Sequence, residues 1–169
     1  MSPEQLLHAH LSHCGAEVRI LEHAACRTSA ESAAARTSAG APDAIGAKAL
    51  VVVGKDGFAM FVLPGMRRLD SRRTRGLIGK YRFARPEEVR EATGGLEVGT
   101  IPPFGRPVFT QIARLIVDTG IAYAEWVGFN AACLTRSAVM TGKAYLGAAS
   151  PDLVDDISLP LDADPDGES

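Results

Sequence analysis

The chain has 169 residues, of which 46% are hydrophobic and 22% charged, and its formal net charge is -2. At this length a single core can bury about 70% of the surface that the unfolded chain exposes, so stability requires neither a disulfide framework nor a structural metal. Strand-sized apolar stretches such as residues 49–53 and 112–117 fall well short of the roughly 20 residues of a membrane span. The composition therefore excludes a membrane-spanning protein and indicates one folded domain.

The N-terminus and the cysteines give the expected compartment. Residues 1–5 contain no basic region followed by an apolar stretch, so a secretory signal is not expected. The three cysteines, Cys14, Cys26 and Cys133, are scattered and form no Cys-x-x-Cys pair. Both observations predict a reduced, cytoplasmic protein.

Charge is unevenly distributed along the chain. Eight basic residues and one acidic residue lie between positions 67 and 85, and no Lys or Arg follows residue 143. A basic run of this density can bind phosphate, with Arg72, Arg73 and Arg75 as candidate contacts to a nucleic acid; the alternative is a solvated helix face. The acidic end predicts a flexible tail over residues 148–169, which leaves a folded domain over residues 1–147.

The first part of the chain predicts two helices around a short strand. A helix begins after Ser2, which can cap it, and ends at Gly15. Alternating residues 17–20 then indicate a half-buried strand. A second helix begins after Thr28, where Thr-x-x-Glu forms a capping box, and ends at Gly40.

A β-hairpin follows at the centre of the chain. Residues 49–53 and 58–63 are apolar strands joined by Asp56-Gly57, a strong signal for a tight turn. The first strand is apolar on both faces and is expected at the middle of a sheet. The later elements are expected to be helix 70–79, helix 86–94, strands 112–117, 122–127 and 132–135, and a last helix from Ser137 to Gly147. This order predicts an α/β (α+β) domain with a mixed central sheet and surrounding helices.

Two features indicate a site for an anion. Lys48 lies at the entry to the central strand, where its ammonium is either a surface charge or is directed at a bound anion. Residues 99–107 hold three prolines and two glycines, which make a stiff, shaped loop. Such a loop can hold backbone N–H groups in fixed directions, as oxyanion binding requires.

Other kinds of chemistry have weaker signals. All four histidines lie in the first 23 residues, so a metal site would have to use His8, His10 and His13, and His10 and Cys14 share one helix face. A Cys–His nucleophile pair in the same region is a further alternative. The sequence contains none of the Gly-x-Ser-x-Gly, Walker, Gly-x-Gly-x-x-Gly or His-Glu-x-x-His motifs of common hydrolases and nucleotide-binding proteins.

The order of several short motifs resembles the YbaK/ProX family of aminoacyl-tRNA deacylases, which is related to the editing domain inserted in bacterial prolyl-tRNA synthetases. The resemblance covers residues 15–147. The motifs are His23 with Thr28-Ser29-Ala30-Glu31, Gly46-Ala47-Lys48, Leu63-Pro64-Gly65, Leu69-Asp70, Ala84-Arg85-Pro86, Thr93-Gly94 and Gly99-Thr100-Ile101-Pro102-Pro103-Phe104-Gly105.

The resemblance implies a trans-editing enzyme that hydrolyses the ester bond of a mischarged tRNA carrying a small amino acid. It assigns catalysis to Lys48, Gly99 and Thr100, without a metal or cofactor. It implies that the substrate-binding residues are His23, Thr28, Pro103, Phe104, Gly128 and Asn130. It also implies tRNA, including tRNA(Pro), as the partner, with a synthetase as a further candidate. The alternative is a non-catalytic module of the same fold that binds tRNA or a protein.

The sequence departs from one subgroup of that family. Alanine-removing members carry Asn directly after the lysine and a His in a late loop, whereas here Ala49 follows Lys48 and no His follows His23. The amino acid therefore remains open among Ala, Ser, Thr, Cys and an unnatural residue.

Overall fold

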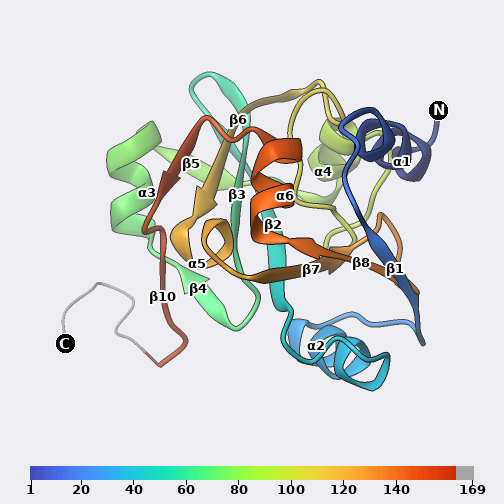
Figure 1. Cartoon of the computed structure of the whole chain (residues 1–169). Helices are drawn as coiled ribbons and strands as arrows, with labels where there is room; N and C mark the ends of the chain where they lie inside the picture. Colours follow the sequence, from blue (N-terminus) through green and yellow to red (C-terminus); the bar gives the residue numbers. More distant parts are fainter. Residues whose placement is uncertain (163–169) are drawn as a thin grey trace.

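The computed structural model describes residues 1–162, which form one α/β domain (Figure 1). The helices are α1 (Pro3–His13), α2 (Ser29–Ser38), α3 (Ser71–Ile78), α4 (Pro86–Thr93), α5 (Thr119–Ala122) and α6 (Gly142–Ala149). The strands are β1 (Arg19–Glu22), β2 (Ile45–Gly54), β3 (Gly57–Pro64), β4 (Arg67–Leu69), β5 (Tyr81–Phe83), β6 (Ile112–Asp118), β7 (Trp126–Asn130), β8 (Arg136–Thr141), β9 (Leu153–Asp155) and β10 (Ser158–Pro160). The predicted fold class is confirmed.

The main sheet is mixed and has the order β1-β8-β7-β2-β3-β6-β9, and β4 and β10 form a separate pair. The predicted hairpin is the antiparallel pair of β2 and β3, and β2 is central as expected. The other edge of β2 has two neighbouring strands, at different positions along its length. Ile45 and Gly46 pair in parallel with β7, whereas residues 52–54 pair with β5. Between these contacts, residues 47–50 have no strand partner on that edge among the described residues, so the sheet is split there.

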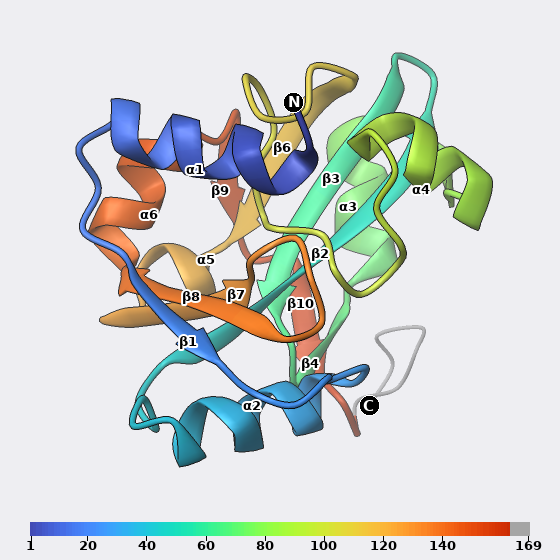
Figure 2. The ribbon, with the colours of Figure 1, turned by 90° about the vertical axis from the view of Figure 1, so that its right-hand side faces the viewer.

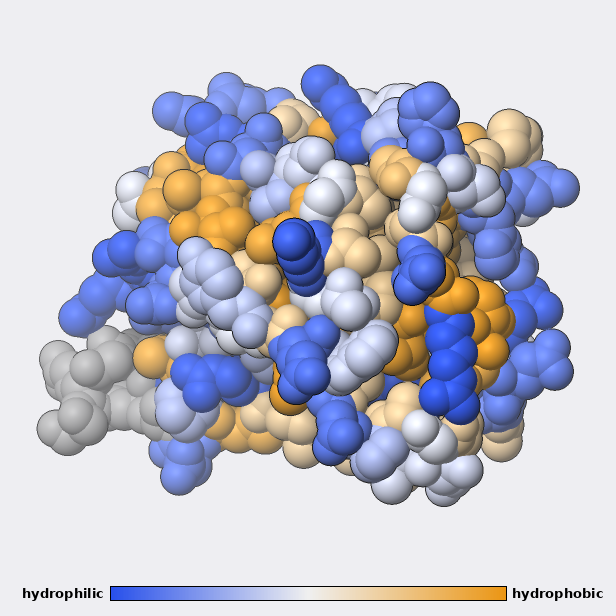
Figure 3. Space-filling model, viewed as in Figure 1, coloured by the Kyte–Doolittle hydropathy of each residue, from blue (hydrophilic) through white to orange (hydrophobic). Residues whose placement is uncertain are grey.

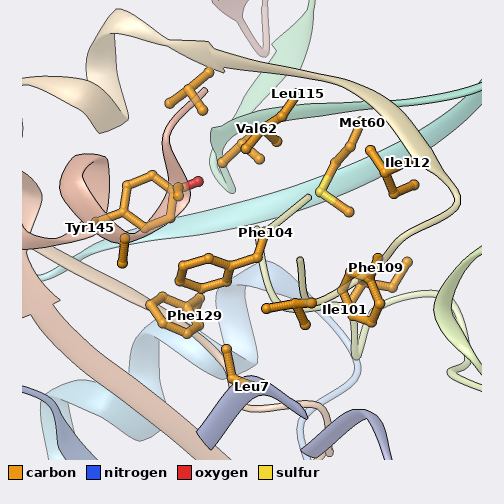
Figure 4. Close-up of a cluster of buried hydrophobic side chains, with 14 of the residues drawn as sticks. Leu7, Met60, Val62, Ile101, Phe104, Phe109, Ile112, Leu115, Phe129 and Tyr145 are labelled. Carbon is orange, nitrogen blue, oxygen red and sulfur yellow. The ribbon is translucent and has the colours of Figure 1, made fainter. Parts of the chain in front are cut away.

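Most of the core lies between the sheet and the helices α1, α4 and α6. Phe104, Phe129 and Tyr145 stack edge to face with ring centroids 5.4 Å apart for the two contacts of Phe104. Figure 4 shows these rings together, with Leu7 of α1 beside them. Aromatic packing of this kind fixes the loop that carries Phe104 against the sheet.

Local signals located the helix starts in the first half of the chain. The side chains of Ser2, Thr28 and Asp70 accept hydrogen bonds from the third backbone N–H of α1, α2 and α3, as capping requires. Strand β1 begins later than predicted and buries Leu21, while Ile20 is exposed. Among the described strands it pairs with β8 alone, so the packing against that strand, and not the local alternation, sets which side chains point inward.

The predicted boundaries after residue 118 are wrong. Residues 119–122 form the short helix α5, so the strand expected from residue 122 begins only at Trp126. Ser137 lies inside β8 and does not cap a helix; Thr141 caps α6 by accepting from the N–H of Ala144. Short segments rich in Ala, Val and Thr suit either state, and pairing with β7 selects the strand here.

The predicted tail boundary at residue 147 is also corrected. Helix α6 continues to Ala149, β9 pairs in parallel with β6, and β10 pairs with β4. Acidic side chains of this segment make specific bonds, because Asp152 accepts from the N–H of Leu115 and Asp155 pairs with Arg73. The segment to residue 160 therefore belongs to the domain, and the predicted tail over residues 163–169 lies outside the described residues.

Figure 3 shows hydrophilic side chains around the rim and across the middle of one face, with apolar areas between them. Among residues 1–162, no helix is both long enough and apolar enough to cross a bilayer.

Candidate active site

A cavity of about 360 Å³ lies at the split in the sheet, and we call it the α2 cavity. Helix α2 forms one wall, the start of β2 the floor, and the loop at residues 98–101 and Asn130 the opposite side. Figure 2 shows α2 below β2 and β7. The lining that the described residues form contains three cations, Arg27, Arg36 and Lys48, and no Asp, Glu, His or Cys. The cavity therefore suits an anionic or oxygen-rich ligand.

Lys48 lines the α2 cavity, as the sequence led us to expect. Its half-buried Nζ donates to the carbonyl of Arg67 at 2.6 Å and to that of Gly65 at 3.4 Å. Burial lowers the pKa of this amine. Two of its three N–H groups are used to fix the ammonium, which leaves one N–H directed by the others and available to a ligand.

The loop after α4 brings a backbone group to the cavity. Gly99 has φ +91°, a conformation that L side chains rarely adopt, and its carbonyl accepts from Nδ2 of Asn130. This bond ties the loop to the end of β7 across the split in the sheet. The Asn130 Oδ1 is buried and has no hydrogen-bond partner among the described residues. The predicted Gly99 and Asn130 therefore meet, in a closed polar contact at the cavity wall.

Helix α2 supplies Thr28 to the cavity rim. Its hydroxyl oxygen accepts from the N–H of Glu31, so the residue caps the helix. Ser32 and Arg36 lie one and two turns further along the same helix face. The sequence prediction found the cap but missed the two buried residues that follow it.

Arg36 is the main residue that the sequence did not indicate. It is 4% exposed, its Nε is buried without a hydrogen-bond partner, and it forms no ion pair among the described residues. Burial lowers the pKa of its guanidinium, and the nearby Cys26 opposes this shift. An arginine on an Ala-rich helix is typical of a solvent-exposed face, so no local signal distinguishes it.

Five of the predicted catalytic and substrate-binding residues are absent from the cavity lining: His23, Thr100, Pro103, Phe104 and Gly128. The Thr100 hydroxyl donates to the carbonyl of Glu97 at 2.7 Å. Phe104 lies in the core, and the carbonyl of Pro103 accepts from the Tyr145 hydroxyl at 2.6 Å.

Thr100, Pro103 and Phe104 therefore hold the loop from behind, outside the cavity lining. His23 is likewise absent from the lining. Its Nε2 contacts the Ser137 hydroxyl at 2.8 Å, and its Nδ1 contacts the carbonyl of Ala24.

The structure explains why residue 128 is a glycine, which the sequence did not show. It pairs with Gly46 in the parallel β7–β2 contact, and both glycines lie under the Arg36 side chain. A Cβ at Gly128 would be 2.5 Å from Cδ of Arg36, and one at Gly46 would be 2.3 Å from its Nη2. The glycine pair therefore makes the hollow in which this arginine lies.

The basic run and the histidines lie elsewhere. Helix α3, which carries Arg72, Arg73 and Arg75, is separate from α2 in both ribbon views (Figures 1 and 2). Within residues 1–162, no group of three or more His, Cys, Asp or Glu side chains is placed to hold a metal ion. Nε2 of His10 instead hydrogen bonds to the carbonyl of Ala148 at 2.7 Å.

Known proteins resemble the chain over most of its length. Residues 23–147 match the aminoacyl-tRNA editing domain. The chain belongs to this family. The multifunctional Ser/Thr-tRNA deacylase ProXp-y of Escherichia coli is 33% identical over 158 residues, which cover 89% of this chain and 90% of that protein.

Solved structures agree. The crystal structure of a proposed trans-editing enzyme for prolyl-tRNA synthetase has a TM-score of 0.78 and 26% identity, covering 94% of this chain and 98% of that one. The hypothetical protein APE2540 has a TM-score of 0.76 and 26% identity, covering 91% and 99%. The editing domain is therefore present over nearly its whole length, and the prediction of an aminoacyl-tRNA deacylase is confirmed.

Proposed function

We propose that this editing domain acts in trans on tRNA mischarged with a small hydroxylated amino acid, serine or threonine, and that the α2 cavity is its active site. The observation that carries the proposal is that Lys48 and Gly99 both line one cation-rich cavity. The substrate range is taken from the name of the E. coli relative, and tRNA(Pro) is one acceptor consistent with the related structures.

The chemistry follows from the residues that line the cavity. In the proposed reaction, water attacks the ester carbonyl, the C–O bond to the ribose breaks, and the ribose oxygen leaves with a proton. The developing oxyanion requires donors that are already oriented. The Lys48 ammonium, held by two carbonyls, and the backbone N–H of Gly99 are the candidates.

Within the described part of the chain, the lining offers no side chain that is an obvious general base. An aminoacyl ester is already activated, so positioning water and stabilising charge supply much of the required catalysis. We assign the transfer of the water proton to a neighbouring ribose hydroxyl of the tRNA itself. Thr28, on the rim, and Asn130, which fixes the loop, are proposed to shape the amino-acid site.

The rest of the tRNA remains outside the cavity. We retain Arg72, Arg73 and Arg75 as proposed contacts to its backbone, with a cytoplasmic location and a synthetase as a partner. The alternative function, a non-catalytic module that binds tRNA or a protein, predicts binding without loss of the ester.

The decisive experiment compares wild type with Lys48→Met on a panel of tRNAs charged with Ala, Ser, Thr or Cys. Removing a charged donor to the transition state is expected to lower kcat/KM by about 10²-fold or more. Lys55→Met is the matched control, because Lys55 is exposed in the β2–β3 turn. If wild type and Lys48→Met hydrolyse every ester equally, the proposed active site is wrong.

A further inference from the structure

Arg36 is a buried cation without a partner in the described part of the chain. It is 4% exposed, and its side chain forms no ion pair or hydrogen bond among the described residues and faces a cavity whose lining there has no carboxylate. Arginine stays protonated in proteins, so its charge persists even though burial lowers its pKa. A buried charge is costly unless it is paired, which indicates that a ligand supplies the partner.

The surrounding backbone is shaped to hold this side chain. Gly46 and Gly128 pair across β2 and β7, and a Cβ on either would overlap the Arg36 side chain. Nε is sealed in this hollow, whereas the terminal nitrogens are not fully buried and have no acceptor within residues 1–162. The guanidinium therefore presents its terminal N–H groups to the cavity from a fixed position.

The position of Arg36 decides which part of a substrate it meets. Among the lining residues, Ile45, Met66 and Val98 are 42%, 54% and 61% exposed, so we take their part of the cavity as its opening. Ser32 and Arg36 are only 6% and 4% exposed, so we take their part as the closed end. The terminal phosphate of a tRNA is joined to the rest of the nucleic acid and must stay near the opening, so only the aminoacyl group can reach the closed end.

We propose that Arg36 is a specificity-determining residue, whose terminal N–H groups bind an oxygen on the side chain of the esterified amino acid. This inference rests on the proposed function and extends it to the residue that selects the substrate. A side-chain carboxylate pairs with the buried charge and a hydroxyl accepts a hydrogen bond from its N–H groups, whereas alanine and valine leave these N–H groups without an acceptor. Sites built to hydrogen bond a substrate oxygen reject analogues that lack it more strongly than apolar pockets reject an added methylene.

The test measures kcat/KM for tRNA esters of serine, alanine, threonine, valine and aspartate with wild type, Arg36→Met and Arg36→Lys. Serine is expected to be preferred to alanine, and threonine to valine, in wild type. Arg36→Met is expected to reduce each preference by about 10- to 100-fold, the effect of losing one charged hydrogen bond. Arg36→Lys retains the charge without the planar fork and is expected to restore part of the preference. The aspartate ester shows which kind of oxygen Arg36 binds. Faster hydrolysis of the aspartate ester than of the serine ester identifies a carboxylate, and slower hydrolysis identifies a hydroxyl.

Arg114→Met is the matched control, since Arg114 is exposed on β6 outside the α2 cavity. Binding of hydrolysis-resistant seryl and alanyl amides of 3'-amino-3'-deoxyadenosine gives a readout that does not depend on catalysis. An unchanged serine-to-alanine ratio in folded Arg36→Met, for both hydrolysis and binding, would overturn the role of Arg36. Failure of wild type to hydrolyse any ester would instead contradict the proposed function, and the amide binding ratio would still test Arg36.

Discussion

Two arginines on separate helices show how differently this molecule accommodates positive charge. Arg36 on α2 is buried over two glycines and has no partner among the described residues. Arg73 on α3 is exposed and pairs with both oxygens of Asp155, at 2.8 Å and 2.8 Å. The Arg73–Asp155 pair raises the pKa of Arg73 and lowers that of Asp155, since each charge stabilises the other.

The charge of Arg73 is neutralised within the fold, whereas we propose that the charge of Arg36 is paired only by a ligand. The α3 region uses acidic residues from the end of the chain to neutralise part of its basic run. The α2 cavity, by contrast, has no carboxylate in the lining that residues 1–162 provide. A dense basic sequence is therefore a weaker indication of a site here than one unpaired cation in a cavity.

The largest effect that tests this comparison is expected from Gly128→Ala. Its Cβ would lie 2.5 Å from Cδ and 2.7 Å from Nε of Arg36, so the arginine must leave its hollow while its charge remains in the protein. We expect the preference for serine over alanine esters to fall about tenfold or more, as in Arg36→Met. Steady-state kinetics on both esters measures the change, and Gly147→Ala is a control because a Cβ there would meet no neighbouring atom of the described residues within 4 Å. Retained selectivity would show that the position of Arg36 does not matter.

A smaller effect is expected from replacing Arg72, Arg73 and Arg75 together by Gln. If they contact the tRNA backbone, KM should rise several-fold and the salt dependence of binding should become shallower, with the ratio between amino acids unchanged. Binding titrations at several salt concentrations measure both quantities. Identical salt slopes for wild type and variant would return this helix to a solvated face.

The smallest effect is expected from Asp155→Asn. The exposed pair with Arg73 is screened by solvent, so the melting temperature at pH 7 should fall by no more than about 2–4 °C. Because the folded-state pKa of Asp155 is lowered, this stabilisation is present above the unfolded value near pH 4 and is lost as pH falls through the folded value. Thermal melts of both proteins should therefore converge at low pH. A difference that grows on acidification would contradict this assignment.

Sequence patterns predicted the elements with strong local signals and failed where pairing decides. Caps at Ser2, Thr28 and Asp70 and the Asp56-Gly57 turn were correct, because each depends on neighbours within four residues. The segment after residue 118 was misplaced, because its strands are defined by distant partners.

The candidate site was also predicted in part. Lys48, Gly99 and Thr28, which belong to short motifs, and Asn130, which the family resemblance implies, all line the cavity. Thr100, Pro103 and Phe104 belong to the same motif but point into the protein, because a stiff loop has an inner and an outer side.

The sequence by itself determined an α/β domain, its helix starts, its central hairpin and its resemblance to an editing family. Only the tertiary structure decided that the acidic end completes two sheets and that Arg36 lies buried over Gly46 and Gly128. The physical reason is distance along the chain. Capping and turns are settled by adjacent residues, whereas the burial of a charge depends on which distant backbone leaves room for it.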